Sequence, residues 1–162
     1  LGDVYKRQNP KNTLTIGDDV YKLQQFHFHA PSENEIDGHT YPLEGHFVYK
    51  TDNGKITVVS VLYNYGDENQ ALKQIWDKMP QAANTETELP QAISLYDFYP
   101  EDKDYYNFEG SLTTPPCTEG VNWIVFKNQE TVSKEQVEKF TQTLGFENNR
   151  PIQDTNGRKI KE

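Results

Sequence analysis

The stretch "QFHFH", residues 25–29, constrains the fold more than any other feature of the chain. Side chains along a β-strand point alternately to its two faces. Gln25, His27 and His29 therefore share one face, and Phe26 and Phe28 share the other. A strand with one aromatic and one polar face predicts a sheet whose core lies on one side. The His-x-His pair, with two of the chain's four histidines, is by itself either a metal site or two buried, hydrogen-bonded histidines.

Several further segments have the pattern of strands. "TLTI" is followed by a Gly-Asp-Asp turn and a long strand from Val20, which predicts a hairpin. Two alternating segments are separated by Asp52-Asn53-Gly54, a hairpin turn signal. The predicted strands are residues 13–16, the stretch from Val20, 41–50, 55–65 and 122–127.

Two segments have helical periodicity. In residues 68–79 an apolar face is bounded by an Asp67–Gln70 capping pattern and by Pro80. The members of that face are Leu72, Ile75, Trp76 and Met79.

The second predicted helix, residues 134–144, has stronger boundaries. Ser133 and Gln136 form a capping pattern, and Gly145 follows the last turn. Val132 and Val137 are spaced as a hydrophobic staple. We expect residues 85–120 to be a long irregular segment, which in a compact domain usually carries function. The predicted fold class is mostly β (α+β): a large twisted, mainly antiparallel sheet with short surface helices.

Length and charge limit the class of protein. A chain of 162 residues favours one domain. Its formal net charge of −9 repels phosphate backbones, so we expect no nucleic-acid partner. No apolar run approaches the ~20 residues of a membrane span, and no signal peptide is visible. The start has no Met, so we set residues 1–8 aside as a non-native remnant and assign residues 9–162 to the domain.

A second strand supplies another histidine in a matching position. In "LEGHFVY", Glu44, His46 and Val48 share a face. If this strand pairs with "QFHFH", three imidazoles converge across strands ~4.8 Å apart. That spacing suits Zn–N bonds of ~2.0–2.1 Å, and three His ligands leave a fourth position for water, as in catalytic zinc sites. His39, in a "DGHT" turn, is expected to be a solvated residue.

Same-face neighbours could orient two of these rings. A ligating imidazole usually donates its other N–H to a carboxylate or an amide oxygen. Gln25 lies two residues from His27, and Glu44 lies two residues from His46. The alternatives are a solvated Gln and a salt-bridged surface Glu.

Two motifs together identify a family resemblance. "QFHFHAPSENEIDGHTYPLEGHFVY" and "GSLTTPPCTEGVNWIVF" resemble the α-class carbonic anhydrases of bacteria, from about Thr13 to the C-terminus. The resemblance implies the α-carbonic anhydrase fold without its N-terminal part. It also implies a Zn²⁺ enzyme for reversible hydration of carbon dioxide to bicarbonate and a proton, by attack of zinc-bound hydroxide. His27, His29 and His46 are then the zinc ligands.

The resemblance also implies roles for other residues. Thr113 accepts a hydrogen bond from the hydroxide and donates one to Glu33, so these two are the catalytic pair. The backbone of Asn148 receives the N–H of His29, and Thr114 lines the substrate site. An apolar wall holds carbon dioxide, although plain core packing would explain the same residue types. Its members are Val48, Val58, Leu112, Val121 and Trp123.

The chain departs from the family at its start. The family is longer there, and no residue here matches its proton-shuttling histidine. The usual disulfide partner of Cys117 lies in that missing segment, which implies a periplasmic or secreted intact protein. We expect zinc binding with reduced turnover, and inhibition by sulfonamides or anions. The sequence is compatible with a homodimer but does not require one.

Two other functions are compatible with parts of the pattern. A cupin-type metalloenzyme would use His27, His29 and Glu33 as a His-x-His-x3-Glu motif, with Glu33 binding iron or manganese directly. A carbonic-anhydrase-like binding module without catalysis is the second alternative. Zinc as the bound metal and inhibition by an aromatic sulfonamide would distinguish the enzyme from both.

Overall fold

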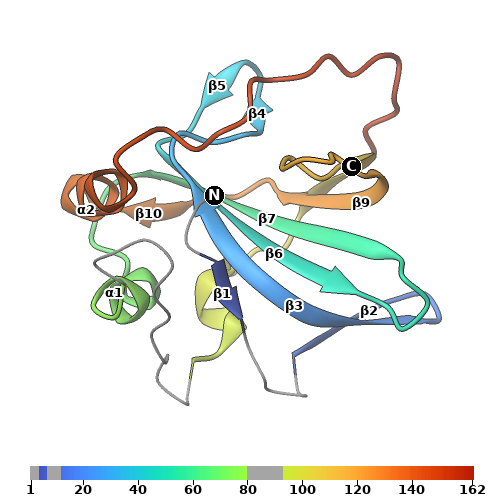
Figure 1. Cartoon of the computed structure of the whole chain (residues 1–162), viewed down its shortest axis with the longest axis horizontal. Coiled ribbons are helices and arrows are strands. Elements are labelled where there is room, and N and C mark those ends of the chain that lie inside the picture. Colours follow the sequence, from blue (N-terminus) through green and yellow to red (C-terminus); the bar gives the residue numbers. More distant parts are fainter. Residues whose placement is uncertain (1–3, 7–11, 80–92) are drawn as a thin grey trace.

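The computed structural model describes residues 4–6, 12–79 and 93–162. Its main feature is a sheet of eight strands in the order β1-β3-β6-β7-β9-β8, with β2 beside β3 and β10 beside β7. The long strands β3, β6 and β7 run side by side across the molecule (Figure 1). The strands are β1 (Val4–Lys6), β2 (Thr13–Ile16), β3 (Asp19–His29), β6 (Leu43–Lys50), β7 (Ile56–Tyr65), β8 (Tyr105–Ser111), β9 (Glu119–Phe126) and β10 (Glu130–Val132). A separate small hairpin pairs β4 (Glu35–Ile36) with β5 (His39–Thr40).

The strand directions confirm the predicted fold class. Most neighbours are antiparallel, whereas β7 is parallel to β9 and to β10. The predicted hairpins are both present: β2 and β3 turn at Gly17, and β6 and β7 turn near Gly54. Both glycines have positive φ (59° and 94°), which a glycine adopts without steric cost. The strand predicted at 122–127 corresponds to β9.

The expectation of an irregular segment at 85–120 is wrong for two stretches. A short 3-10 helix, η1, spans Leu95–Phe98, and β8 pairs along β9 at the edge of the sheet. Strand β8 is mostly half-buried and lacks a clean alternation, so its partner strand rather than its own pattern defines it. Residues 85–92 lie outside the described part of the chain.

The segment that we set aside at the start contributes to the sheet. Val4–Lys6 form β1, which pairs antiparallel with β3 opposite Gln25–His27. These three residues therefore belong to the folded part of the chain. The origin of residues 1–8 as a remnant stays a prediction.

Helix α1 spans Gln70–Trp76, and its predicted apolar face is buried. Its N-terminal cap is Asn69, whose side chain accepts from the N–H of Leu72, so the predicted Asp67–Gln70 cap is wrong. Gln136 holds the backbone of Asn69 through two hydrogen bonds of 2.9 and 2.8 Å, which fixes the start of the helix there. The predicted stop, Pro80, lies outside the described residues.

Helix α2 spans Lys134–Leu144 and has the predicted boundaries. Ser133 and Gln136 form a complete capping box, and Gly145 ends the helix with φ 78°. The indole N–H of Trp76, the last residue of α1, donates to the carbonyl of Gln136 in the first turn of α2, so this bond joins the two helices. In the described part of the chain, no helix is long and apolar enough to cross a membrane.

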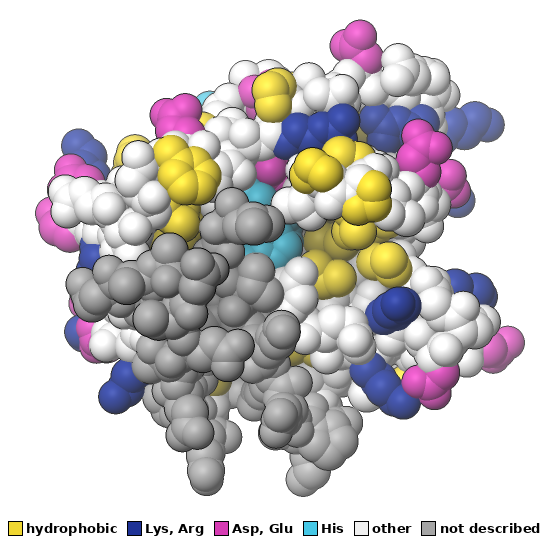
Figure 2. Space-filling model, viewed as in Figure 1, with side chains coloured by type: hydrophobic (Ala, Val, Ile, Leu, Met, Phe, Trp, Pro, Cys, Tyr) yellow, Lys and Arg dark blue, Asp and Glu magenta, His cyan; other side chains and the backbone are white. Residues whose placement is uncertain are grey.

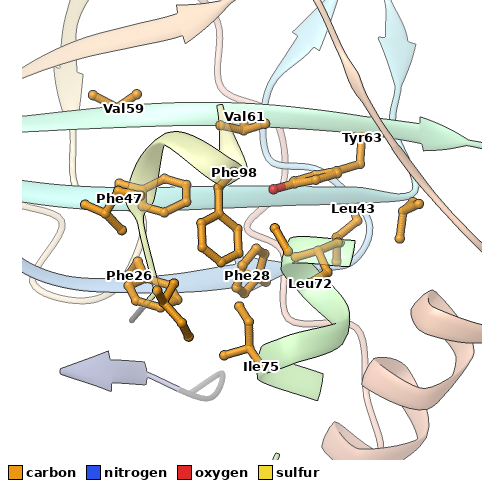
Figure 3. Packing of buried hydrophobic residues seen from close by; sticks show 14 of the residues in the cluster. Phe26, Phe28, Leu43, Phe47, Val59, Val61, Tyr63, Leu72, Ile75 and Phe98 are labelled. Carbon is orange, nitrogen blue, oxygen red and sulfur yellow. The ribbon is translucent and has the colours of Figure 1, made fainter. Parts of the chain in front are cut away.

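The main core lies on one face of the sheet, which we call the packing face. It carries Phe26 and Phe28 of β3, Phe47 of β6, and Val59 and Val61 of β7. Side chains from α1 and η1 close over these residues (Figure 3). Each of these five side chains is at most 3% exposed, so the face is a dry interior.

A β-bulge in β3 decides which residues point to the packing face. The pairing with β6 shifts between Leu23 and Gln25. As a result both Leu23 and Phe26 are buried in the same core, although they are three residues apart. Bulges re-aim the side chains that follow them. The shift here leaves Gln25, His27 and His29 together on the opposite face.

Candidate metal centre

The three predicted histidines converge where β3 and β6 pair. His27 lies directly opposite His46, and His29 lies opposite Glu44. One nitrogen from each of His27, His29 and His46 lies within 4.8 Å of the other two. The space-filling view shows histidine surface in a hollow, beside hydrophobic side chains (Figure 2). We call this side of β3, β6 and β7 the metal face.

Each imidazole has a partner at the nitrogen that is turned away from the cluster. Nδ1 of His27 is 2.7 Å from Oε1 of Gln25, and Nδ1 of His29 is 2.9 Å from the carbonyl of Asn148. Nε2 of His46 is 2.9 Å from Oε1 of Glu44. The contacts expected from the sequence are therefore all present. They leave Nε2 of the first two rings and Nδ1 of the third for a shared ligand.

The donor set fits a metal ion. Nε2 of His29 is buried and has no hydrogen-bond partner among the described residues. Burial, with smaller effects of the neighbouring histidines, lowers the pKa of His27 to about 2; burial likewise lowers the pKa of His29 to about 3. Both rings are therefore neutral, which is the form that binds metal. Three imidazoles are the donor set of a catalytic zinc site with one open position.

Glu44 is fully buried and accepts on both oxygens. Oε1 is 2.5 Å from the hydroxyl of Ser60 and 2.6 Å from Nδ2 of Asn34. Oε2 accepts from the backbone N–H groups of Glu33 and Asn34 at 2.6 and 2.9 Å. Burial alone would raise the pKa of Glu44, but attraction to His46 and these hydrogen bonds outweigh it and lower the pKa to about 2. The same carboxylate outweighs burial at His46 and raises its pKa.

The predicted catalytic carboxylate, Glu33, lies at the edge of the cluster. Its Oε1 accepts from the N–H of Arg150 at 2.7 Å and is 3.3 Å from Nδ1 of His29. Its Oε2 is 3.9 Å from Nδ1 of His46. Burial raises the pKa of Glu33, although His46, Thr113 and the bond from Arg150 act in the opposite direction. Thr113 and Glu33 line the same pocket, and a hydrogen bond between their side chains stays a prediction.

The predicted apolar wall forms one cluster on the metal face. Val58, Val121 and Trp123 are at most 4% exposed. Val48 and Leu112 are half-buried and pack against them. The ring of Trp123 lies 5.0 Å from that of His46, which joins the wall to the histidines.

The other residues singled out in the sequence lie further out. Thr114 is exposed, and its carbonyl accepts from the N–H of Cys117. Cys117 is a free, half-buried thiol with φ 55°. His39 is exposed in β5, in agreement with the expectation of a solvated residue.

Three residues that contact the site were not anticipated. Asn34 and Ser60 both donate to Glu44, and the backbone of Arg150 donates to Glu33. Ser60 had a sequence signal, because it is the one polar residue within the run "VVSVLY". Asn34 and Arg150 had none, since their contacts depend on how loops fold back onto the strands.

Comparisons with known proteins agree with this geometry. The family model for the eukaryotic-type carbonic anhydrases matches residues 4–162. The chain is 48% identical over 151 residues to a carbonic anhydrase of Neisseria gonorrhoeae, and 45% identical over 152 residues to one of Pectobacterium carotovorum. These matches cover 93% and 94% of this chain, which spans about 60% of the relatives' length (60% and 62%).

A solved structure shares the fold at similar identity. The α-carbonic anhydrase of Thermovibrio ammonificans, in complex with the inhibitor sulfanilamide, matches with a TM-score of 0.92 and 43% identity. The match covers 97% of this chain and 73% of that one. The family model, these relatives and the converging histidines lead to one conclusion: the chain belongs to the eukaryotic-type, or α-class, carbonic anhydrase family.

Proposed function

We propose that this protein catalyses the reversible hydration of carbon dioxide to bicarbonate and a proton, with zinc as its cofactor. The observation that carries the proposal is the cluster of three histidine nitrogens within 4.8 Å, each ring held by a separate partner. A zinc ion in such a site lowers the pKa of water to ~7 and so supplies a nucleophile at neutral pH; carbonic anhydrase is the standard example of this effect.

We assign to Thr113 and Glu33 the orientation of the reacting water. An ionised carboxylate can only accept hydrogen bonds, whereas a hydroxyl can donate one and accept another. The hydroxyl of Thr113 would therefore donate to Glu33 and accept from the reacting group, which would aim that group's lone pair. Such pre-positioning of a nucleophile can account for ~10²-fold in rate.

The apolar wall suits a small substrate without charge. Val58, Val121 and Trp123 present no ionised group to the space beside His46. Carbon dioxide makes few hydrogen bonds, so binding depends on displaced water and surface contact. Bicarbonate, which is charged and hydrated, is held less well there, and this difference favours release of the product.

The central experiment measures carbon dioxide hydration by stopped flow on the zinc-loaded chain, beside Thr113→Val. We expect zinc-dependent turnover in the parent protein. We expect about a 10²-fold lower kcat in the variant, with unchanged zinc content. A chain that binds zinc in 1:1 ratio without hydrating carbon dioxide would contradict the proposed activity.

The two alternatives from the sequence are separated by different observations. Membership of the α-class family and the placement of Glu33 outside the ligand cluster exclude the cupin-type site. The non-catalytic binding module is tested by the same kinetics and by an aromatic sulfonamide. A functional enzyme is inhibited by it in a zinc-dependent manner.

Sulfonamide and anion inhibitors are thus the further ligands that we propose for this chain. A homodimer stays a prediction, which light scattering of the purified protein checks. A periplasmic or extracellular location also stays a prediction, to be checked by fractionation of the native host.

A further inference from the structure

Ser60 is a polar residue in an otherwise apolar part of β7. Its neighbours in the chain, Val59 and Val61, point to the packing face, while Ser60 points to the metal face. Ser60 itself is 0% exposed. A buried hydroxyl is unfavourable unless it makes hydrogen bonds, and an alanine or a valine would suit the strand equally well.

The position of Ser60 relative to the histidines is fixed by strand pairing. Ser60 lies directly opposite His46 in the pairing of β6 with β7. Its hydroxyl donates to Oε1 of Glu44 at 2.5 Å. The same oxygen is 2.9 Å from Nε2 of His46. One carboxylate oxygen therefore joins the hydroxyl to the ring.

The remaining contacts of Glu44 keep its carboxylate in one orientation. Asn34 donates to Oε1 through its side chain and to Oε2 through its backbone, and Glu33 also donates to Oε2. The bonds to Oε2 come from a loop, whereas Ser60 approaches from the neighbouring strand. Oε1 has three partners: the side chain of Asn34 from the loop, the ring of His46 on β6, and the hydroxyl of Ser60 on the neighbouring strand β7. Without it, Oε1 would be fixed only by Asn34 and His46.

We propose that Ser60 is a positioning residue for the metal centre: through Glu44 it fixes the ring of His46 and slows the loss of zinc. The inference rests on the proposed zinc centre and adds a determinant of how long the metal stays bound. It acts by geometry, because partners of a ligating histidine fix the direction in which its metal-binding nitrogen points.

The test compares Ser60→Ala with the parent protein and with Thr57→Val. Zinc release from the loaded chain is followed with an excess of a chromogenic chelator. Loss of a ligand's own partner typically costs ~10–100-fold in metal affinity. Ser60 acts one contact further away, so we expect release about 10-fold faster, at the low end of that range. Thr57 is a matched control, because it is fully buried on the same strand and accepts from Asn122 instead of contacting Glu44.

Two further readouts separate positioning from a general loss of structure. The visible spectrum of the Co²⁺-loaded protein should change in Ser60→Ala and stay the same in Thr57→Val, since it reports on ligand geometry. In a Glu44→Ala background, the substitution Ser60→Ala should no longer speed zinc release, because no side-chain oxygen remains to connect Ser60 to His46.

The outcomes are distinct from those for the proposed function. A parent protein that binds no zinc would overturn both proposals. The inference alone is overturned if the parent holds zinc and Ser60→Ala releases it at the parent rate. It is equally overturned if Thr57→Val speeds release as much, or if the effect of Ser60→Ala persists in the Glu44→Ala background.

Discussion

The packing face and the metal face belong to the same three strands, but they are held together differently. On the packing face, Phe26 stacks on Phe47 at 5.5 Å and meets Phe28 edge-on at 6.2 Å. On the metal face, His27 and His46 each depend on one polar partner, Gln25 and Glu44. On the packing face each side chain contacts many neighbours, so no single contact fixes its position. On the metal face one hydrogen bond to a single partner fixes the orientation of each ring.

The two faces therefore control different properties of the protein. Apolar contacts are individually weak and collectively large, so a defect on the packing face lowers the free energy of unfolding. A defect on the metal face misdirects a ligand while the core stays intact. We therefore expect the two faces to separate stability from metal retention, and the following variants test that separation.

The largest effect is expected for His46→Ala. It removes one of three ligands, so zinc affinity should fall by more than the ~10–100-fold that loss of an orienting partner costs. Carbon dioxide hydration should fall with it. Zinc content after dialysis, measured by atomic absorption, checks the prediction. Phe47→Leu, one residue away on the packing face, should retain zinc; equal losses in both would erase the distinction between the faces.

The next largest effect is expected for Phe28→Ala. Phe28 is 0% exposed, and its ring meets those of Trp76 at 4.9 Å and Phe140 at 6.4 Å. Truncation of a buried Phe costs about 3–5 kcal/mol, which is a large part of a small domain's stability. Urea unfolding measures the loss. Zinc stoichiometry of the fraction that remains folded should stay at the parent value; a loss of zinc at 4 °C in folded protein would show that the faces are coupled.

A smaller effect is expected for Gly45→Ala, a substitution on β6. Gly45 lies between Glu44 and His46, and an added Cβ would be 2.9 Å from the ring of Phe28. That ring is enclosed by Trp76, so overpacking should cost about 1–3 kcal/mol. Thermal unfolding checks this value. Gly17→Ala, where the strain comes from positive φ and no atom is within 4 Å, is a control for strain without a clash.

The metal face could be predicted well because it depends on alternation within short stretches of sequence. Alternation in β3 and β6 placed Gln25, His27 and His29 on one side, and strand pairing then required His46 to face them. The same reasoning found both hairpins and the boundaries of α2. Resemblance to a family added Asn148, which is 119 residues from His29 and has no local signal.

The features that sequence reasoning missed depend on tertiary structure. The bulge at Gln24 changes which alternate residues face the core, and no residue type marks it. Strand β8 exists through its pairing with β9. The cap of α1 lies at Asn69 because Gln136, 67 residues away, binds its backbone. In each case a distant partner outweighs local preference.

The smallest effect is expected for Gln25→Ala. Gln25 is half-buried at the rim and contacts His27 through a single hydrogen bond of 2.7 Å. Its loss should speed zinc release by about 10-fold, the lower end of the range for such partners, because His27 keeps its place on the strand but loses its orientation. The free energy of unfolding should change by less than about 1 kcal/mol, the size of one ordinary hydrogen bond.

Gln24→Ala, at the exposed bulge position, is the matched control and should alter neither zinc release nor stability. Chelator competition and urea unfolding on the same samples decide the matter. If Gln25→Ala lowers stability as strongly as Gly45→Ala while zinc release stays unchanged, then the polar partners of the metal face serve folding, and the division of roles between the two faces is wrong.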